Sequence, residues 1–259
     1  MSRIASVFAT PEHKALMPFV TVGYPSVEAT LEIVPLLESL GCDIVELGIP
    51  FSDPLADGIT IQEASHQALC QGVSPSLCLE IAAELRKKVT IPLIFMTYYN
   101  PVFSFGIERF CQSCYKSGID GLIIPDLPPE EAGELENLAQ QYQIDLIYLL
   151  APNSTEERIQ LIAEKSHGFI YLVSLTGTTG ARQKLPSNLE NFVTRVKQKA
   201  SQPLCVGFGI STPEQAQEVA KVADGVIVGS RIIQLLEERS TDKLAEFIKV
   251  LRKALDNCA

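Results

Sequence analysis

A glutamate stands inside an otherwise apolar run of residues, and two aspartates follow it in the next loop. Glu46 lies in the segment IVEL, where an unpaired buried carboxylate costs several kcal/mol. Either a basic neighbour pairs with it, or it faces a wet cavity, has a raised pKa and can both accept and donate protons. The following segment 48–62 contains the prolines and glycines of turns, and it presents Asp53 and Asp57. We expect a turn role for Asp53, whereas Asp57 either forms a turn with Gly58 or reaches the cavity opposite Glu46.

Two glycine-rich turns near the end of the chain have the composition of an anion site. They are VGFGISTPEQ at 206–215 and VIVGSRII at 226–233. Their exposed backbone amides can hold a phosphate against a helix N-terminus, and the residues that would do so are Gly207, Gly209, Gly229 and Ser230. The alternative is that the glycines only permit tight turns. Two such turns together favour a phosphate site.

A third stretch, LTGTTGARQKLP at 175–186, is long, small and polar. Gly177 and Gly180 are potential hinges within it. The composition is typical of a lid that orders over a ligand and excludes water. A merely disordered connection is the competing interpretation.

Eight short apolar runs alternate with amphipathic segments and predict the elements that position these residues. The runs are PFVTV (18–22), DIVELGI (43–49), PLIFMT (92–97), GLIIP (121–125), DLIYLL (145–150), GFIYLVS (168–174), PLCVGFG (203–209) and GVIVG (225–229). Runs without polar alternation suit parallel strands that are buried on both faces. An open doubly wound sheet and a closed barrel both fit, and the count of eight favours a (β/α)8 TIM barrel. In such barrels the chemistry lies at the carboxyl ends of the strands.

The segments between the runs carry helix signals. Ser154 with Glu157, and Thr212 with Gln215, have the spacing of capping boxes. Extra helices are expected at the N-terminus, before residue 18, and at the C-terminus, after residue 240. No linker rich in Pro, Gly or Ser divides the chain, so we predict a single domain over residues 1–259.

The composition narrows the class of protein. With 46% hydrophobic and 20% charged residues the chain can bury a large core, and its net charge of −10 argues against nucleic acid as a partner. No apolar run has the length of a signal peptide or a membrane span. The seven cysteines are odd in number and scattered; only Cys111 and Cys114 are close, which is weak evidence for a metal site. We therefore expect a cytoplasmic protein with reduced thiols, without metal and without membrane contact.

The segment ELGIPFSDPLADG at 46–58 resembles the signature of the α subunits of tryptophan synthase. Further similar segments follow in the order and spacing of that family, from about residue 10 onward: PFVTVGYP, IPDLPPEE, YLVSLTGTTGAR, VGFGISTPEQ and GVIVGSRII. The resemblance implies a (β/α)8-barrel lyase that splits indole-3-glycerol phosphate into indole and glyceraldehyde 3-phosphate. It implies no cofactor, and a tryptophan synthase β subunit as partner in an α2β2 complex.

The resemblance also assigns roles to single residues. Glu46 and Asp57 would be the catalytic pair. The substrate-binding residues would be Phe19, Tyr98 and Tyr171 around the indole ring, Phe208 near the glycerol phosphate, and Gly180, Gly209, Gly229 and Ser230 at the phosphate. Thr179 would close over the site and orient Asp57, while Asp53 and Pro128 would face the β subunit. Leu175 and Thr178 depart from the family's usual residues in the lid.

The implied reaction is a retro-aldol cleavage. Glu46 would protonate the indole ring at C3 and then accept the hydroxyl proton as the aldehyde forms, while Asp57 would stabilise the positive ring. A free-standing lyase that needs no β subunit shares these motifs. A catalytically dead regulatory subunit is the alternative of another class, and the presence of both carboxylates argues against it.

Overall fold

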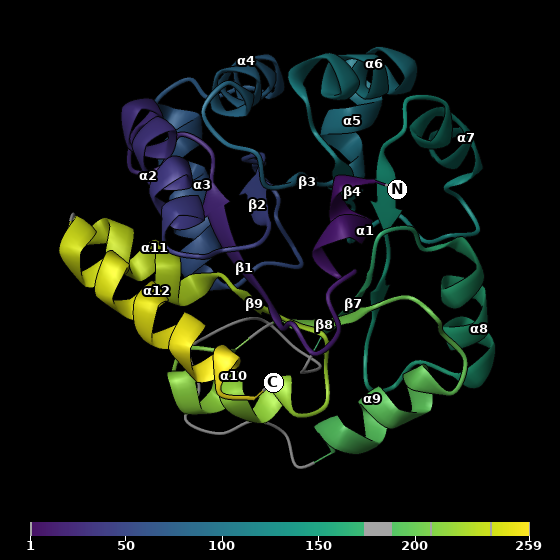
Figure 1. Ribbon diagram of the computed structural model, residues 1–259. Coiled ribbons are helices and arrows are strands. Elements are labelled where there is room, and N and C mark those ends of the chain that lie inside the picture. Colours follow the sequence, from purple (N-terminus) through teal and green to yellow (C-terminus); the bar gives the residue numbers. More distant parts are fainter. Residues whose placement is uncertain (1, 174–187, 208, 239, 259) are drawn as a thin grey trace.

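Nine parallel strands form one sheet in the computed structural model, which describes residues 2–173, 188–207, 209–238 and 240–258. Figure 1 shows the strands at the centre and the helices around them. The strands are β1 (Ala15–Thr21), β2 (Val45–Gly48), β3 (Leu93–Met96), β4 (Gly121–Ile123), β5 (Asp145–Ile147), β6 (Leu149–Leu150), β7 (Ile170–Val173), β8 (Leu204–Gly207) and β9 (Gly225–Val228).

The strand order identifies a barrel. The order is β5-β4-β3-β2-β1-β9-β8-β7-β6, so the two ends of the sheet are β5 and β6. These two are consecutive in the chain and are separated by Tyr148 alone. The predicted fifth strand is therefore one interrupted strand, which pairs with β4 through its first half and with β7 through its second. The predicted TIM barrel is confirmed, and the open doubly wound sheet is not formed.

Helices cover the outside of the strands and follow them along the chain. They are α1 (Arg3–Val7), α2 (Val27–Ser39), α3 (Ile59–Cys70), α4 (Pro75–Arg86), α5 (Tyr99–Phe105), α6 (Ile107–Ser117), α7 (Gly133–Gln141), α8 (Glu156–Lys165), α9 (Leu189–Lys197), α10 (Pro213–Ala220), α11 (Ser230–Glu237) and α12 (Thr241–Asp256). The terminal helices α1 and α12 confirm the two predicted at the ends of the chain.

One of the two predicted capping boxes is confirmed. Thr212 and Gln215 cap each other reciprocally at the start of α10. The other was placed one residue too early, because the Thr155 side chain, not that of Ser154, accepts from the Arg158 N–H at the start of α8. The Ser154 hydroxyl instead accepts the N–H of Ala151, and so it serves the turn that precedes the helix.

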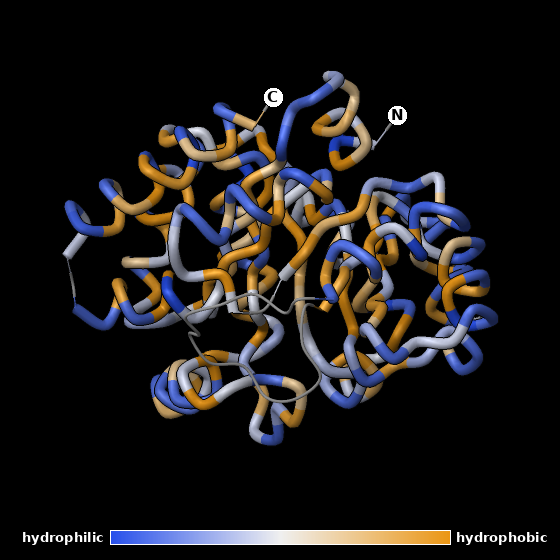
Figure 2. The backbone as a smooth tube through the Cα atoms, turned by 90° about the horizontal axis from the view of Figure 1, so that it is seen from below, coloured by the Kyte–Doolittle hydropathy of each residue, from blue (hydrophilic) through white to orange (hydrophobic). Residues whose placement is uncertain are grey.

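Apolar side chains fill the inside of the barrel and the layer between strands and helices. All seven residues of β1 are buried, and this strand begins three residues earlier than predicted, at Ala15. Figure 2 shows hydrophobic segments concentrated at the centre and hydrophilic ones on the periphery. No helix among the described residues is both long and apolar enough to cross a membrane.

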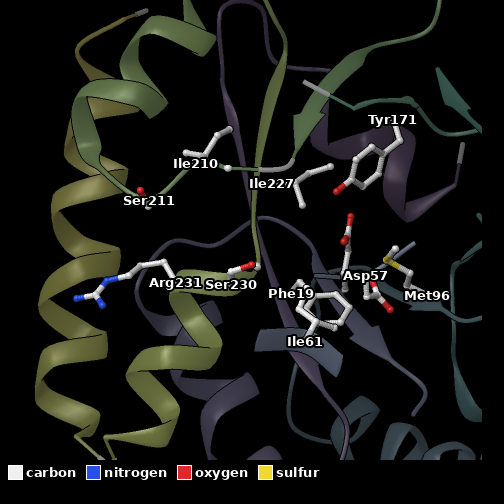
Figure 3. A pocket seen from close by; sticks show the side chains of 13 residues that line it. Phe19, Asp57, Ile61, Met96, Tyr171, Ile210, Ser211, Ile227, Ser230 and Arg231 are labelled. Atoms are coloured by element: carbon white, nitrogen blue, oxygen red, sulfur yellow. The ribbon is translucent and has the colours of Figure 1, made fainter. Parts of the chain in front are cut away.

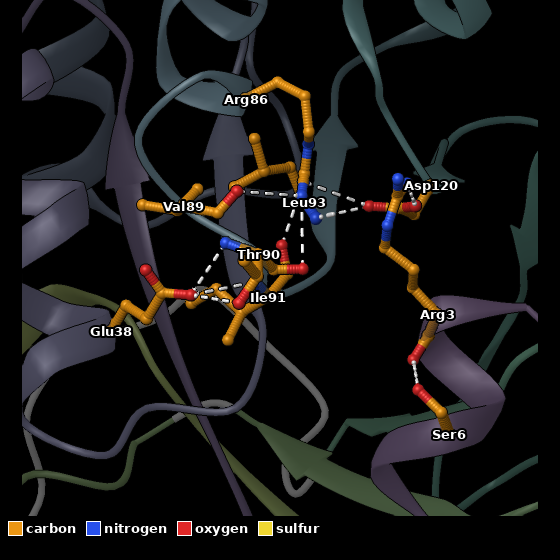
Figure 4. Close-up of polar contacts among 9 residues, drawn as sticks. All are labelled: Arg3, Ser6, Glu38, Arg86, Val89, Thr90, Ile91, Leu93 and Asp120. Carbon is orange, nitrogen blue, oxygen red and sulfur yellow. Dashed lines mark hydrogen bonds and ion pairs between the residues drawn. The ribbon is translucent and has the colours of Figure 1, made fainter.

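A network of charged side chains holds the amino-terminal end of the barrel (Figure 4). Asp120, which directly precedes β4, accepts hydrogen bonds from Arg3 of α1 at 2.7 Å and from Arg86 of α4 at 3.2 Å. Its second oxygen also accepts the N–H of Leu93, the first residue of β3, at 2.9 Å. One buried carboxylate thus joins α1, α4, β3 and β4.

The loop that leads into β3 is held from both sides. The Arg86 guanidinium donates to the carbonyls of Val89, Thr90 and Ile91. Glu38 of α2 accepts the N–H groups of Thr90 and Ile91 at 2.7 and 3.1 Å, and also the Thr90 hydroxyl. These bonds fix where β3 begins. They therefore fix the register of β3 against β2, the strand that carries Glu46.

We expect Asp120→Asn to destabilise the fold by about 2–4 kcal/mol, because it leaves the largely buried Arg86 guanidinium without its counter-charge. The free energy of unfolding from urea titration measures this. Glu84→Gln, which breaks an exposed ion pair between α4 and its C-cap residue Lys87, is the matched control and should cost about 0.5 kcal/mol or less. Equal losses in the free energy of unfolding would show that Asp120 contributes no more than an exposed ion pair does.

Candidate active site

A pocket opens at the carboxyl ends of the strands, where barrel enzymes place their chemistry. Figure 3 shows the side chains that surround it. The lining residues come from five strand ends, from the loops after β2 and β8, and from the first turns of α3 and α11: Phe19, Glu46, Asp57, Ile61, Met96, Tyr171, Gly209, Ile210, Ser211, Ile227, Gly229, Ser230 and Arg231. Of the residues predicted for the site, six line one cavity together with Glu46: Phe19, Asp57, Tyr171, Gly209, Gly229 and Ser230.

Glu46 is the second residue of β2, between Phe19 of β1 and Ile94 of β3. Its side chain is 1% exposed, and neither carboxyl oxygen has a hydrogen-bond partner among the described residues. Burial raises the pKa of Glu46 to about 8, because a charged carboxylate loses the solvation of water there. Of the two interpretations of this residue, a structural ion pair is therefore excluded within the described part of the chain.

Asp57 reaches the same pocket from the loop after β2. It is 7% exposed, and its Oδ2 accepts a hydrogen bond from the Tyr98 hydroxyl at 3.1 Å. Burial raises the pKa of Asp57 to about 6, and the bond from Tyr98 limits the rise. The pocket thus holds two carboxyl groups, of which Glu46 is mainly protonated and Asp57 mainly ionised at neutral pH.

Backbone and side-chain bonds fix the loop that carries Asp57. The Asp57 N–H donates to the Pro54 carbonyl at 3.0 Å, and the Gln62 side chain donates to the Asp57 carbonyl at 2.8 Å. The Tyr98 hydroxyl accepts the Ala56 N–H at 2.8 Å, next to the residue whose carboxylate it contacts. Asp57 is therefore held by Gln62 in the first turn of α3 and by Tyr98, the second residue after β3.

Tyr98 lies beside the pocket rather than in its lining. Its ring contacts Phe51, with the ring centroids 5.4 Å apart, and its hydroxyl bridges Ala56 and Asp57. Its observed contacts orient the carboxylate, whereas the expected contact with an aromatic ligand stays a prediction.

Two glycines make room for the aromatic rings of the pocket. A side chain at Gly48 would overlap the Phe19 ring, and one at Gly207 would overlap the Tyr171 hydroxyl. The glycine-rich turn predicted an anion site at Gly207, but the observed reason for this glycine is the space that Tyr171 occupies. Gly48 was not singled out, although it stands two residues after Glu46 and so faces the same side of β2.

The apolar wall contains four further residues that the sequence did not single out. They are Ile61, Met96, Ile210 and Ile227. Met96 and Ile227 lie at the ends of β3 and β9, so their position in the predicted strands could have placed them at the mouth of the barrel. Ile61 lies on α3, and nothing in its helical segment indicated that it turns toward the strands.

The two glycine-rich turns differ in what they offer an anion. At α10 the Gln215 side chain already accepts the N–H groups of Ser211 and Thr212. At α11 the N-cap is Gly229 and no side chain caps the helix. Uncapped amides at the positive end of a helix favour an anion, so the α11 end is the stronger phosphate position.

Several predicted residues lie outside the described part of the chain. These are Thr179, Gly180 and Phe208, together with the hinge Gly177, the departures Leu175 and Thr178, and the rest of the predicted lid 175–186. Asp53 is exposed in the loop after β2, where its carbonyl accepts the Leu55 N–H, as expected for a turn residue.

The whole chain, not the pocket alone, matches known proteins. The sequence profile of the family "Tryptophan synthase alpha chain" matches residues 6–258. The chain belongs to the tryptophan synthase alpha chain family. A relative from Dehalococcoides mccartyi, the tryptophan synthase alpha chain, is 58% identical over 257 residues, which are 99% of this chain and 100% of that protein.

Solved structures of the family agree. The alpha subunit from Legionella pneumophila has a TM-score of 0.91 at 37% identity and covers 99% of both chains. A chain of tryptophan synthase from Mycobacterium tuberculosis has a TM-score of 0.90 at 34% identity, over 98% of this chain and 100% of that one. Members of this alpha chain family are lyases. Among the residues that the structure describes, no three potential metal ligands lie together.

In this family member we expect Tyr98→Phe to raise the pKa of Asp57 above about 6, because the hydroxyl that stabilises the ionised carboxylate is lost. Titration of the protein by NMR, with ¹³C-labelled aspartate, measures this pKa. Tyr99→Phe removes the neighbouring hydroxyl, for which no bond to Asp57 is observed, and serves as the control. An unchanged Asp57 pKa in Tyr98→Phe would contradict the orienting role of Tyr98.

Proposed function

We propose that Glu46 and Asp57 perform the retro-aldol cleavage of indole-3-glycerol phosphate to indole and glyceraldehyde 3-phosphate, the alpha reaction of tryptophan synthesis. One observation carries this proposal: a buried carboxyl group with no hydrogen-bond partner among the described residues, Glu46, and a second carboxyl group bonded by the Tyr98 hydroxyl, Asp57, line the same pocket. Environments that separate two pKa values in this way divide acid and base roles between the groups.

Glu46 acts first as an acid. With a pKa of about 8 it carries its proton at neutral pH and donates it to C3 of the indole ring, which becomes a positively charged indolenine. The bond between C3 and the glycerol carbon then breaks, and its electron pair returns to the ring. The hydroxyl on that carbon loses its proton to the Glu46 carboxylate as the aldehyde forms. Glu46 ends the cycle protonated.

Asp57 stabilises the charge that develops between these two proton transfers. As a carboxylate it accepts a hydrogen bond from the indole N–H and lowers the energy of the positive ring. Its pKa of about 6 keeps it ionised at neutral pH. The apolar wall of Phe19, Met96 and Ile227 excludes water, so both electrostatic effects are stronger than in solution.

The phosphate of the substrate would lie at the other side of the pocket. Gly209 has φ +86°, a conformation that favours glycine, and the uncapped start of α11 at Gly229 and Ser230 supplies amides. Of the other predicted contacts, we assign Gly180 to the phosphate, Phe208 to the glycerol phosphate and Thr179 to closure over the ligand.

We also propose the β subunit of tryptophan synthase as partner, in an α2β2 complex. Three large apolar side chains are exposed on the segments just after β2 and β3, at the same end of the barrel as the pocket: Leu55 (85%), Ile59 (70%) and Phe103 (64%). Apolar side chains at such exposure favour burial by another protein. We place the reaction in the cytoplasm, and the seven free cysteines support a reducing compartment.

The carboxyl pair predicts a bell-shaped pH profile. We expect kcat/KM to fall as the pH drops through about 6, because Asp57 becomes protonated, and to fall as the pH rises through about 8, because Glu46 loses the proton it must donate. Steady-state rates of indole formation between about pH 5 and pH 9.5 measure both limbs.

Two isosteric variants test which carboxyl group causes which limb of the pH profile. Glu46→Gln should reduce kcat by about 10³-fold or more while substrate still binds, and Asp57→Asn should reduce it by about 10²-fold or more. Glu32→Gln, on the outer helix α2, is the control and should leave the profile unchanged. Substantial turnover by Glu46→Gln would remove the acid–base role from Glu46.

The partner is tested by the same assay with and without an added β subunit. We expect slow cleavage by the isolated chain and a strong acceleration in the complex, because the loop after β2 carries both Asp57 and the exposed Leu55, so a partner that covers Leu55 acts directly on the site. Fast cleavage that ignores the β subunit would instead indicate a free-standing lyase. No indole under either condition, from a folded protein, would falsify the proposed reaction.

A further inference from the structure

The segment IPDLPPEE follows β4 at the catalytic end of the barrel, and its aspartate contacts a helix that begins after a different strand. Asp126 is the third residue after Ile123, where β4 ends. Its Oδ1 accepts the Tyr99 N–H at 2.9 Å. Tyr99 is the first residue of α5, and the N-cap residue Tyr98 makes no side-chain bond to this helix start. Asp126 therefore supplies, from another loop, an acceptor that the start of α5 lacks.

The residue that Asp126 bonds stands next to the one that holds Asp57. The Tyr98 hydroxyl accepts the Ala56 N–H at 2.8 Å and donates to Asp57 Oδ2 at 3.1 Å. Helix α5 has seven residues, so the N–H groups of its first turn are a large share of its backbone donors. A shift of the start of α5 would move the Tyr98 hydroxyl away from both Ala56 and Asp57.

The Tyr98 hydroxyl stays a donor at the pH values where Asp57 titrates. Burial first, then the Asp57 carboxylate and last that of Asp126 raise the pKa of Tyr98, so the hydroxyl keeps its proton. The other titratable groups that face Asp57 are Glu46 and Tyr171, and their pKa values also lie above that of Asp57. A change in the pKa of Asp57 therefore reports on its bond to Tyr98.

We propose that Asp126 is a positioning residue for the cleavage reaction: it fixes the start of α5, and through Tyr98 it places the Asp57 carboxylate. This rests on the proposed function above. Asp126 is exposed and is not among the described residues that line the pocket, so it acts through Tyr98 rather than on the substrate. It joins the loop after β4 to the loop after β2 by way of Tyr98, just after β3. Three neighbouring strand ends thus hold one carboxylate.

The test compares Asp126→Ala with Asp126→Asn. Alanine removes the acceptor, whereas asparagine keeps an oxygen for the Tyr99 N–H and removes only the charge. We expect Asp126→Ala to raise the pKa of Asp57, measured by NMR with ¹³C-labelled aspartate, and to move the acidic limb of the pH profile with it. It should also lower kcat by roughly three- to tenfold with less than about a twofold change in KM. Asp126→Asn should leave these values unchanged, and an equal loss in Asp126→Asn would overturn the proposal.

Ser74→Ala is the matched control for the loss of a helix cap. The exposed Ser74 hydroxyl accepts the Leu77 N–H at the start of α4, so this substitution removes a cap away from the pocket. Both alanine variants should lower the urea midpoint of unfolding, but only Asp126→Ala should move the pKa of Asp57. An equal pKa shift in Ser74→Ala would show a general loosening of the fold and would overturn the role of Asp126.

A double-mutant cycle tests the route through Tyr98. In the Tyr98→Phe background, Asp126→Ala should leave the pKa of Asp57 unchanged, because the hydroxyl through which Asp126 acts is already gone. An additive rise would overturn this route. If the unsubstituted protein forms no indole yet Asp126→Ala alone still raises the pKa of Asp57, the proposed reaction fails and the positioning role stands. An unchanged pKa of Asp57 in Asp126→Ala would overturn that role whatever the enzyme does.

Discussion

A carboxyl group without a hydrogen-bond partner among the described residues, Glu46, lies inside the barrel, and the arrangement of the site depends on this constraint. In water such a group ionises near pH 4.5, and its burial among the side chains of the barrel raises its pKa to about 8. The buried strand β1 contributes to this burial, because Phe19 is the strand neighbour of Glu46 and its ring occupies the space that a side chain at Gly48 would fill.

The hydrogen bonds and ion pairs that offset the cost of this buried group lie at the opposite, amino-terminal end of the barrel. Three aspartates lie one or two residues before a strand, and each accepts an N–H near the start of the neighbouring strand. Asp43 accepts it from Leu16, Asp120 from Leu93 and Asp224 from Leu204, at 2.8 to 2.9 Å. Asp43 and Asp120 also form ion pairs with arginines, Arg252 and Arg86. The repeated contact sets the stagger between neighbouring strands. The amino-terminal end is thus tightly bonded, so the carboxyl-terminal end can keep polar groups unpaired for a ligand.

The sequence predicts the barrel and the catalytic end well. It does not predict the features that depend on tertiary packing. The eight apolar runs predict the strands because parallel strands need no polar face. The interruption at Tyr148 was not predictable, since the run DLIYLL is apolar after its first residue and only closure of the barrel divides its pairing between β4 and β7. The role of Gly207 was likewise hidden, because a glycine in a turn motif and a glycine under an aromatic ring look the same in one sequence. Glu46 was identifiable because a carboxylate in an apolar run is costly in any fold.

The difference between Glu46 and Asp57 follows from their backbone positions. Glu46 is on a strand between two other strands, so its surroundings are side chains of the barrel, and no N–H or hydroxyl of the described residues bonds to its carboxyl group. Asp57 is on a loop, and a loop can be approached by a donor from the next strand end, here Tyr98. Asp57 is also less deeply buried, at 7% exposed against 1% for Glu46, and its pKa rises to about 6 rather than about 8. A neutral Asp57 could not stabilise a positive ring. The shallower burial of the loop residue and one hydroxyl, placed just after β3, together divide the two carboxyl groups into a proton donor and a fixed negative charge.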